Sequence, residues 1–226
     1  MKIVFFGDSI TKGCFEILNI NGTPEILRDP PSGYAARVAK ALPARFPDIP
    51  FVFVNRGKSG DATDAALGRL ASDVLAEHPD LVICCFGLND AGYRDPVLFA
   101  ARLSEIFVRL QAGGAKVVYM TPNMMNRYVS PEVHDGVLAT ARDCAACQND
   151  GTFDRYMEAA IAAAHAHGVP VADAYARWKE LDRYGVDTTA LLCNRINHPT
   201  RKMHALFADV LLEILGAEGV IVSDSQ

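Results

Sequence analysis

Short apolar runs recur along the chain and predict the strands of a buried sheet. The runs are continuous rather than alternating, as in strands that are covered on both faces. Five of them are rich in β-branched and aromatic residues: Ile3–Phe6, Phe51–Val54, Leu81–Phe86, Lys116–Met120 and Val169–Ala172. We therefore expect a five-stranded sheet with little exposed strand surface.

Apolar residues at helical spacing lie between these runs. They form three groups: Tyr34, Val38 and Leu42; Val97, Ala101, Ile106, Phe107 and Leu110; and Met157, Ile161 and Ala164. The clearest helix is the last one, where residues 203–214 carry one apolar face, Pro199 suits the first turn and Gly216 suits the stop. Alternating strands and helices predict a parallel sheet with right-handed crossovers, in a three-layer α/β/α sandwich.

Two further stretches are too long to be simple connections, namely Cys14–Ser32 and Pro122–Gly151. Long loops in compact domains are usually functional, so we expect both to form walls of a binding site. The chain has 226 residues, without an internal repeat or a low-complexity linker. This length favours a single domain over residues 1–226.

The composition excludes several classes of partner. Half of the residues are hydrophobic, 22% are charged and the net charge is −5, with no basic run. We therefore expect neither a nucleic-acid partner nor a membrane partner. No apolar stretch reaches the roughly 18 residues of a membrane span or resembles a signal peptide, which predicts a cytoplasmic protein. The six cysteines do not suggest a disulfide framework, because two of them are adjacent in an apolar run.

Polar, glycine-containing turns follow each of the first three predicted strands. They are Gly7–Ile10, Asn55–Asp61 and Gly87–Asp90. Any one of them could be an ordinary turn, since Gly, Asp, Asn and Ser are the residues that turns use. However, the carboxyl ends of parallel strands meet at one crevice, where ligands bind in open α/β sheets. Three such turns, with a histidine before the last helix, favour a functional site there.

Two other motifs point to cofactors but fail on spacing. Gly57-Lys58-Ser59 looks like the end of a phosphate-binding loop, yet Val52 stands where the upstream glycine would be. Cys144 and Cys147 have the spacing of a redox pair or half a zinc site, but lie in a predicted loop with no second pair nearby. We expect no cofactor and no metal, and keep a thiol-redox or metal-binding protein as an alternative.

Four motifs in order resemble the SGNH (GDSL-type) hydrolase family of esterases and acylhydrolases. They are Gly7–Ile10, Ser59–Gly60, Gly87–Asp90 and His198–Pro199, and together they span nearly the whole chain. The resemblance implies a flavodoxin-like SGNH hydrolase fold. It also implies Ser9 as the nucleophile, His198 as the base, and an oxyanion hole formed by Ser9, Gly60 and Asn89.

These residue types suit the chemistry. A serine hydroxyl becomes a good nucleophile when a nearby imidazole takes its proton, and the oxyanion that forms needs hydrogen-bond donors already aimed at it. Gly60 would let the backbone approach closely because it has no side chain. Asp8 is predicted to stabilise its turn. His204 competes with His198 as the base, but its place in a helix favours a core role.

One position departs from the family pattern. The family usually has an aspartate three residues before the histidine, and this chain has Arg195 there, with Asn194 one residue earlier. Asn194 is therefore expected to orient His198, with a backbone carbonyl, Asp182 or Asp187 as alternatives. A nearby Arg195 would lower the pKa of His198.

The resemblance predicts a serine esterase that hydrolyses short-chain acyl esters through an acyl-serine intermediate, with acetyl as the expected acyl group and a carbohydrate as a candidate alcohol. The expected partner is thus a small-molecule ester such as an acylated sugar. Two alternatives stay open besides the thiol-redox or metal-binding protein. One is a catalytically silent carbohydrate-binding protein, and the other is an acyltransferase or thioesterase with the same serine and histidine.

Overall fold

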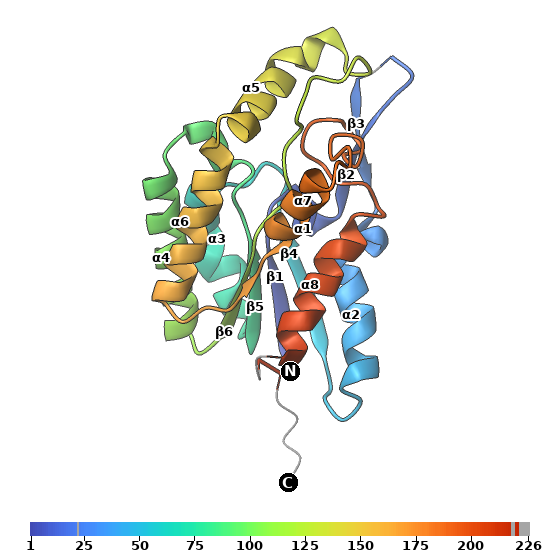
Figure 1. The fold of residues 1–226 in the computed structure, drawn as a ribbon. Coiled ribbons are helices and arrows are strands. Elements are labelled where there is room, and N and C mark those ends of the chain that lie inside the picture. The colour runs from blue at the N-terminus through green and yellow to red at the C-terminus, as the bar shows by residue number, and fades with distance from the viewer. Residues whose placement is uncertain (22, 218–219, 222–226) are drawn as a thin grey trace.

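Five parallel strands form the central sheet of the computed structural model, which describes residues 1–21, 23–217 and 220–221 (Figure 1). Their order across the sheet is β4 (Val52–Gly57), β1 (Lys2–Gly7), β5 (Leu81–Cys85), β6 (Lys116–Met120) and β7 (Val171–Ala172). Central β5 is buried throughout, whereas β4 lies at an edge and is partly exposed. The continuous apolar runs thus correctly predicted parallel strands, but the expectation of burial on both faces was wrong for the edge strand β4.

Helices cover both faces of this sheet (Figure 1). One layer contains α2 (Tyr34–Arg45), α7 (Ala174–Arg183) and α8 (His204–Ala217), and the other contains α3 (Thr63–Asp73), α4 (Pro96–Ala112) and α6 (Thr152–Ala166). In α4 the buried side chains recur at helical spacing and include Leu103, Ile106 and Leu110. The three-layer α/β/α sandwich is confirmed.

Both long stretches contain regular structure beyond the carboxyl ends of the strands (Figure 1). The first is an antiparallel hairpin of β2 (Cys14–Leu18) and β3 (Pro24–Arg28), which follows the short helix α1 (Ser9–Lys12). The second contains α5 (Leu138–Asn149). The remaining elements are short 3₁₀ turns: η1 (Pro30–Ser32), η2 (Leu75–Glu77), η3 (Asp90–Tyr93) and η4 (Asp135–Val137).

Several boundaries differ from the predicted ones. The last helix begins at His204 rather than at Pro199, because residues 191–200 fold back on themselves in a narrow loop. In this loop the amide of Thr200 donates to the carbonyl of Leu191 at 2.9 Å, and Leu192 and Pro199 form an isolated bridge. Gly216 lies inside α8 rather than at its stop, and α3 and α7 had no predicted counterpart.

Candidate active site

Ser9 lies just after the carboxyl end of β1 and is the first residue of α1. The Asp8 side chain caps this turn by accepting a hydrogen bond from the amide of Ile10 at 2.9 Å, as predicted for a turn-stabilising residue. Gly7 is required here, because a Cβ at this position would lie 2.1 Å from Oγ1 of Thr11 and 2.6 Å from the carbonyl oxygen of Cys85. The close packing of this turn therefore fixes the position of the Ser9 hydroxyl.

His198 meets Ser9 across 189 residues of sequence. Its Nε2 lies 2.9 Å from the Ser9 Oγ, which is hydrogen-bond distance, and the ring is buried. The loop that carries His198 is held from within by Asn194, whose Oδ1 accepts hydrogen bonds from the amides of Ile196, Asn197 and His198 at 2.9–3.0 Å. The geometry thus brings together the serine and the histidine that the motifs singled out.

The other ring nitrogen, Nδ1, faces two oxygens that the sequence did not single out. Asn197 Oδ1 lies 2.8 Å away and Glu16 Oε2, from the hairpin, lies 3.4 Å away. Because an amide oxygen only accepts hydrogen bonds, the ring proton is on Nδ1, which donates a hydrogen bond to Asn197 Oδ1. This tautomer leaves the Nε2 lone pair directed at the Ser9 hydroxyl, as a general base requires.

Asn194 lies at this site, but its contacts differ from the expected one. Its Oδ1 is used by the loop amides, and its Nδ2 donates to Glu16 Oε2 at 3.0 Å and to Asn197 Oδ1 at 2.9 Å. Nδ2 is also 3.2 Å from His198 Nδ1, where two N–H groups would face each other. Asn194 thus links the two oxygens that face the ring.

Arg195 is turned away from His198. Its guanidinium bonds to Glu132 at 3.1 Å and to the carbonyl oxygens of Ala190 and Leu192. The pKa of His198 is indeed lowered, but the main cause is burial of the ring, and the nearby Glu16 carboxylate opposes the shift. The expected direction was right, and the expected cause, the Arg195 charge, was wrong.

The two alternative aspartates are bonded elsewhere. Asp182 pairs with Arg127 at 3.3 Å, and Asp187 accepts a hydrogen bond from the Tyr128 hydroxyl at 2.8 Å. Glu16, by contrast, was missed because the apolar and polar residues of Cys14–Leu18 do not alternate; only the observed strand places Glu16 on the same face as Cys14.

Gly60 and Asn89 line the same pocket as Ser9. The Asn89 Nδ2 donates one hydrogen to the carbonyl oxygen of Asp61 at 2.9 Å, which fixes the orientation of the amide. An amide nitrogen has a second hydrogen, which remains for an oxyanion. Gly60 adopts φ +73°, and a Cβ there would meet nothing within 4 Å. Glycine is thus favoured by its left-handed backbone rather than by the lack of space that we expected.

His204 is a core residue. Its Nδ1 accepts a hydrogen bond from the amide of Tyr34 at 3.1 Å, and its ring packs against Phe15 and Phe207. Burial and the positive charge of Arg37 lower its pKa to about 3. The ring is therefore neutral at physiological pH, with a proton on Nε2 that finds no partner within the described part of the chain.

Three buried carboxylates surround the turns of the site. Burial raises the pKa of Asp8 to about 7 and also raises the pKa of Asp90, which accepts two hydrogen bonds from Thr63. Asp61 forms an ion pair with Arg69, whose nitrogens lie 2.6 and 2.8 Å from its Oδ2. These carboxylates fix the turns and do not reach the His198 ring nitrogens.

A pocket of about 230 Å³ opens over the Ser9 hydroxyl. All five residues that the sequence singled out line it: Ser9, Gly60, Asn89, Asn194 and His198. Its remaining walls come from the hairpin, the turn after β4, the segment of η4 and α5, and the loop before α8: Cys14, Glu16, Ile26, Ser59, Val137, Thr140, Ile196 and Asn197. An adjoining pocket of about 400 Å³ shares Asn89, Thr140 and Asn197 with it. Both long stretches therefore form site walls, as predicted.

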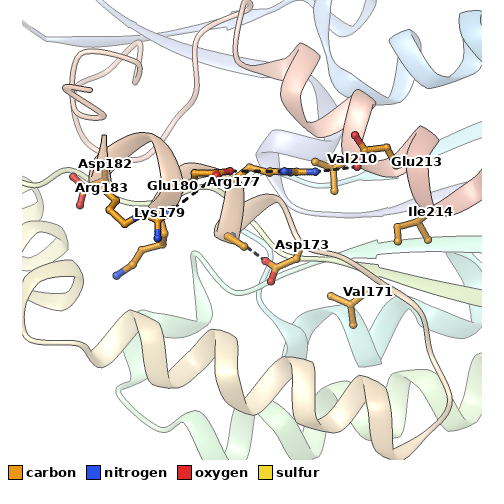
Figure 2. A pocket seen from close by; sticks show the side chains of 11 residues that line it. Val171, Asp173, Arg177, Lys179, Glu180, Asp182, Arg183, Val210, Glu213 and Ile214 are labelled. Carbon is orange, nitrogen blue, oxygen red and sulfur yellow. Dashed lines mark hydrogen bonds and ion pairs between the residues drawn. The ribbon is translucent and has the colours of Figure 1, made fainter. Parts of the chain in front are cut away.

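A larger pocket of about 970 Å³ lies elsewhere, between α7 and α8 (Figure 2). In its wall Arg177 forms ion pairs with both Glu180 and Glu213 (Figure 2). None of the residues that line it belongs to the Ser9 pocket. Its size alone therefore does not make it a candidate active site.

The cysteine pair is helical and is not joined by a disulfide. Cys144 and Cys147 lie on helix α5 rather than in the predicted loop, and burial raises the pKa of both thiols, that of Cys144 to about 12. Within residues 1–21, 23–217 and 220–221, no cluster of three or more His, Cys, Asp or Glu has metal-binding geometry. Nor does any helix of this part have the length and apolarity to cross a bilayer.

A Ser–His pair at the carboxyl edge of a parallel α/β sheet is typical of serine hydrolases. The sequence model of the GDSL-like Lipase/Acylhydrolase family matches residues 5–206, and the chain belongs to this family. The resemblance found from the four motifs is confirmed.

Individual relatives agree with this assignment. An acetylxylan esterase of Geobacillus stearothermophilus is 33% identical over 98 residues, which are 39% of this chain and 39% of the relative. An arylesterase of Vibrio mimicus is 32% identical over 109 residues, which are 43% of this chain and 54% of the relative. The match thus spans only about half or less of these curated relatives.

Solved structures match over nearly the whole chain. An acetylxylan esterase from Geobacillus stearothermophilus has a TM-score of 0.71 at 23% identity, covering 95% of this chain and 94% of that one. An alpha/beta hydrolase from the metagenome of Lake Arreo has a TM-score of 0.70 at 24% identity, covering 98% and 96%. At this identity the likeness establishes the fold.

Proposed function

We propose that this protein is a serine esterase that hydrolyses short acyl esters, chiefly acetyl esters of carbohydrates, through an acyl-serine intermediate. The observation that carries the proposal is the distance of 2.9 Å between Ser9 Oγ and His198 Nε2, in a ring tautomer that accepts the serine proton. Membership of the GDSL-like family and the similarity to an acetylxylan esterase and an arylesterase support it.

The first half of the reaction transfers the acyl group to the enzyme. Ser9 Oγ attacks the carbonyl carbon of the ester while its proton moves to His198 Nε2. The carbonyl oxygen becomes an oxyanion, held by the backbone amides of Ser9 and Gly60 and the side-chain amide of Asn89. The carbon–oxygen bond to the alcohol then breaks, and the alcohol leaves with the proton from His198.

The second half regenerates the enzyme with water. Water gives a proton to His198 Nε2 and its oxygen attacks the acyl-serine carbonyl, forming a second oxyanion in the same hole. Breaking the bond to Ser9 Oγ releases the carboxylic acid, and the proton returns to the serine oxygen.

The size and chemistry of the pocket support a short acyl group on a polar alcohol. A volume of about 230 Å³ is small beside the 300–1,000 Å³ typical of ligand pockets. Apolar contact comes from Ile26, Val137 and Ile196, whereas amide and hydroxyl groups of the neighbouring residues can bond to the hydroxyls of a sugar.

A chain-length series tests this proposal. We expect kcat/KM to fall steadily from 4-nitrophenyl acetate to butyrate and octanoate, because a longer acyl chain exceeds the pocket. Purified protein should also release acetate from acetylated xylo-oligosaccharides, as measured by enzymatic acetate detection. A rate maximum at octanoate would contradict the short-chain assignment, and no hydrolysis of any ester would favour the binding-protein alternative.

Asn89→Ala tests the oxyanion hole separately. We expect kcat with 4-nitrophenyl acetate to fall about 10²- to 10³-fold with little change in KM, because the amide acts on charge that develops only in the transition state. Steady-state kinetics at several substrate concentrations measures the two constants. An equal loss through KM alone would indicate that Asn89 binds the ground state instead.

A further inference from the structure

We propose that Glu16, from the β2–β3 hairpin, is the carboxylate that positions His198 and stabilises its positive charge during the reaction. It would take the role that the family usually gives to an aspartate three residues before the histidine, where this chain has Arg195. The inference rests on the proposed serine esterase function and assigns it a further residue.

The contacts around Nδ1 carry this proposal. His198 Nδ1 donates its hydrogen bond to Asn197 Oδ1 at 2.8 Å. Glu16 Oε2 lies 3.4 Å from the same nitrogen. Asn194 Nδ2 donates to Glu16 at 3.0 Å and to Asn197 at 2.9 Å, so it holds both oxygens in place. The carboxylate is therefore fixed at ion-pair distance from the ring.

Charge explains why this position matters. When the Ser9 proton moves to Nε2, the ring becomes an imidazolium, and a negative charge 3.4 Å from Nδ1 stabilises it. The His198 side chain is 8% exposed and that of Glu16 is 30% exposed. Water therefore screens this attraction less than it screens a surface pair.

The strand register turns Glu16 toward the site. Side chains alternate along β2, so Cys14 and Glu16 line the pocket while Phe15 points into the core. The Phe15 ring packs on His204, with 4.8 Å between ring centroids, and under the guanidinium of Arg201 at 4.9 Å. Shifting the strand by one residue would expose Phe15 and turn Glu16 away, so burial of Phe15 fixes the carboxylate beside His198.

Other charged groups near the ring are engaged elsewhere. Arg195 bonds to Glu132, and Arg201 bonds to Asp29 at 2.7 Å. The neighbouring His204 is neutral because burial lowers its pKa to about 3. Within the described part of the chain, Glu16 is the one carboxylate that forms an ion pair with His198.

Glu16→Gln removes the charge and keeps an oxygen that can accept the hydrogen bond from Asn194. We expect kcat with 4-nitrophenyl acetate to fall about 10²-fold at unchanged KM. A serine protease whose triad aspartate becomes an amide loses about 10⁴-fold, because its histidine takes the wrong tautomer. The loss should be smaller here, because Asn197 still keeps the ring proton of His198 on Nδ1. Glu16→Asp retains the charge one methylene further away, and its kcat should lie between those of wild type and Glu16→Gln.

The pH profile separates a charge effect from a structural one. The fall of kcat/KM at acid pH, the acid limb of the profile, reports the pKa of His198 in the free enzyme. The Glu16 carboxylate raises this pKa. Loss of that charge should move the limb of Glu16→Gln to lower pH, while Glu16→Asp stays closer to wild type. Imidazole NMR titration of His198 should show the same shift without any need for turnover.

Glu25→Gln is the matched control. Glu25 lies on the partner strand of the same hairpin, is exposed and accepts a hydrogen bond from Asn19 at 2.9 Å. It should leave both kcat and the acid limb unchanged.

The outcomes separate the two proposals. An active wild type whose kcat and acid limb are unaffected by Glu16→Gln would overturn the role of Glu16 and leave the esterase intact. An inactive wild type would overturn the esterase. In that case the NMR titration still decides whether Glu16 sets the pKa of His198, and an unmoved pKa would overturn the inference.

Discussion

Replacing Ser9 by alanine is expected to lower kcat with 4-nitrophenyl acetate by a factor on the order of 10⁶, the size found when a serine protease loses its nucleophile. Without the Ser9 oxygen no acyl-enzyme can form, so any remaining rate comes from attack by water in the oxyanion hole. Active-site titration with a serine-directed phosphonate should give one adduct per wild-type chain, at Ser9 by peptide mass mapping, and none in Ser9→Ala.

His198→Ala should lose about as much, and the double variant should lose little more than either single one. The two side chains share one hydrogen bond at 2.9 Å and act on the same proton, so their effects do not add. Ser72→Ala is the control, because Ser72 is an exposed serine on α3, and it should retain wild-type kcat. Undiminished hydrolysis by Ser9→Ala would mean that Ser9 is not the nucleophile.

The apolar pattern predicted the inner strands of the sheet well because these strands are buried on both faces. Lys116–Met120 was predicted with its observed bounds, since nearly every side chain of this strand lies in the core. At the edge the pattern is weaker. Phe51–Val54 underestimates β4, which continues to Gly57 with polar residues, because partner strand β1 fixes these positions through backbone pairing.

Helices with little apolar surface were not predicted. Helix α5 buries mainly small or polar side chains, among them Ala141, Ala145 and Gln148, so no wide apolar stripe marks it in the sequence. The same applies to the hairpin, whose exposed Ile26 and Leu27 lie beside Glu25 and Arg28 without strict alternation. Such elements are set by tertiary contacts that a single sequence does not display.

The motifs identified the residues around the Ser9 hydroxyl, but not the two residues whose oxygens face Nδ1 of His198. Ser9, Gly60, Asn89 and His198 follow strand ends or precede a proline, positions at which the topology forces convergence. Glu16 reaches the ring only through the register of a short hairpin, and Asn197 through a turn held by Asn194. Neither depends on the topology of the sheet, so the sequence alone did not reveal them.

His204 and Asp8 should give opposite pH dependences to the free energy of unfolding. His204 has its pKa lowered from 6.5 to about 3, so its contribution to stability is present above pH 6.5 and is lost as pH falls toward 3. At about 1.4 kcal/mol per unit of pKa shift, the free energy of unfolding that is lost amounts to about 5 kcal/mol. Asp8 has its pKa raised from 3.8 to about 7, so its contribution is present below pH 3.8 and is lost as pH rises toward 7.

Between about pH 4 and 6.5 the two effects nearly cancel, because the folded protein holds one proton more at Asp8 and one fewer at His204 than the unfolded chain. Urea unfolding at several pH values should therefore show a steeper loss of stability on acidification in Asp8→Asn than in wild type. His204→Asn, whose side-chain oxygen can still accept from the Tyr34 amide, should instead gain stability relative to wild type as the pH falls. Parallel curves of unfolding free energy against pH for the three proteins would show that neither group is held in its uncharged form by the fold.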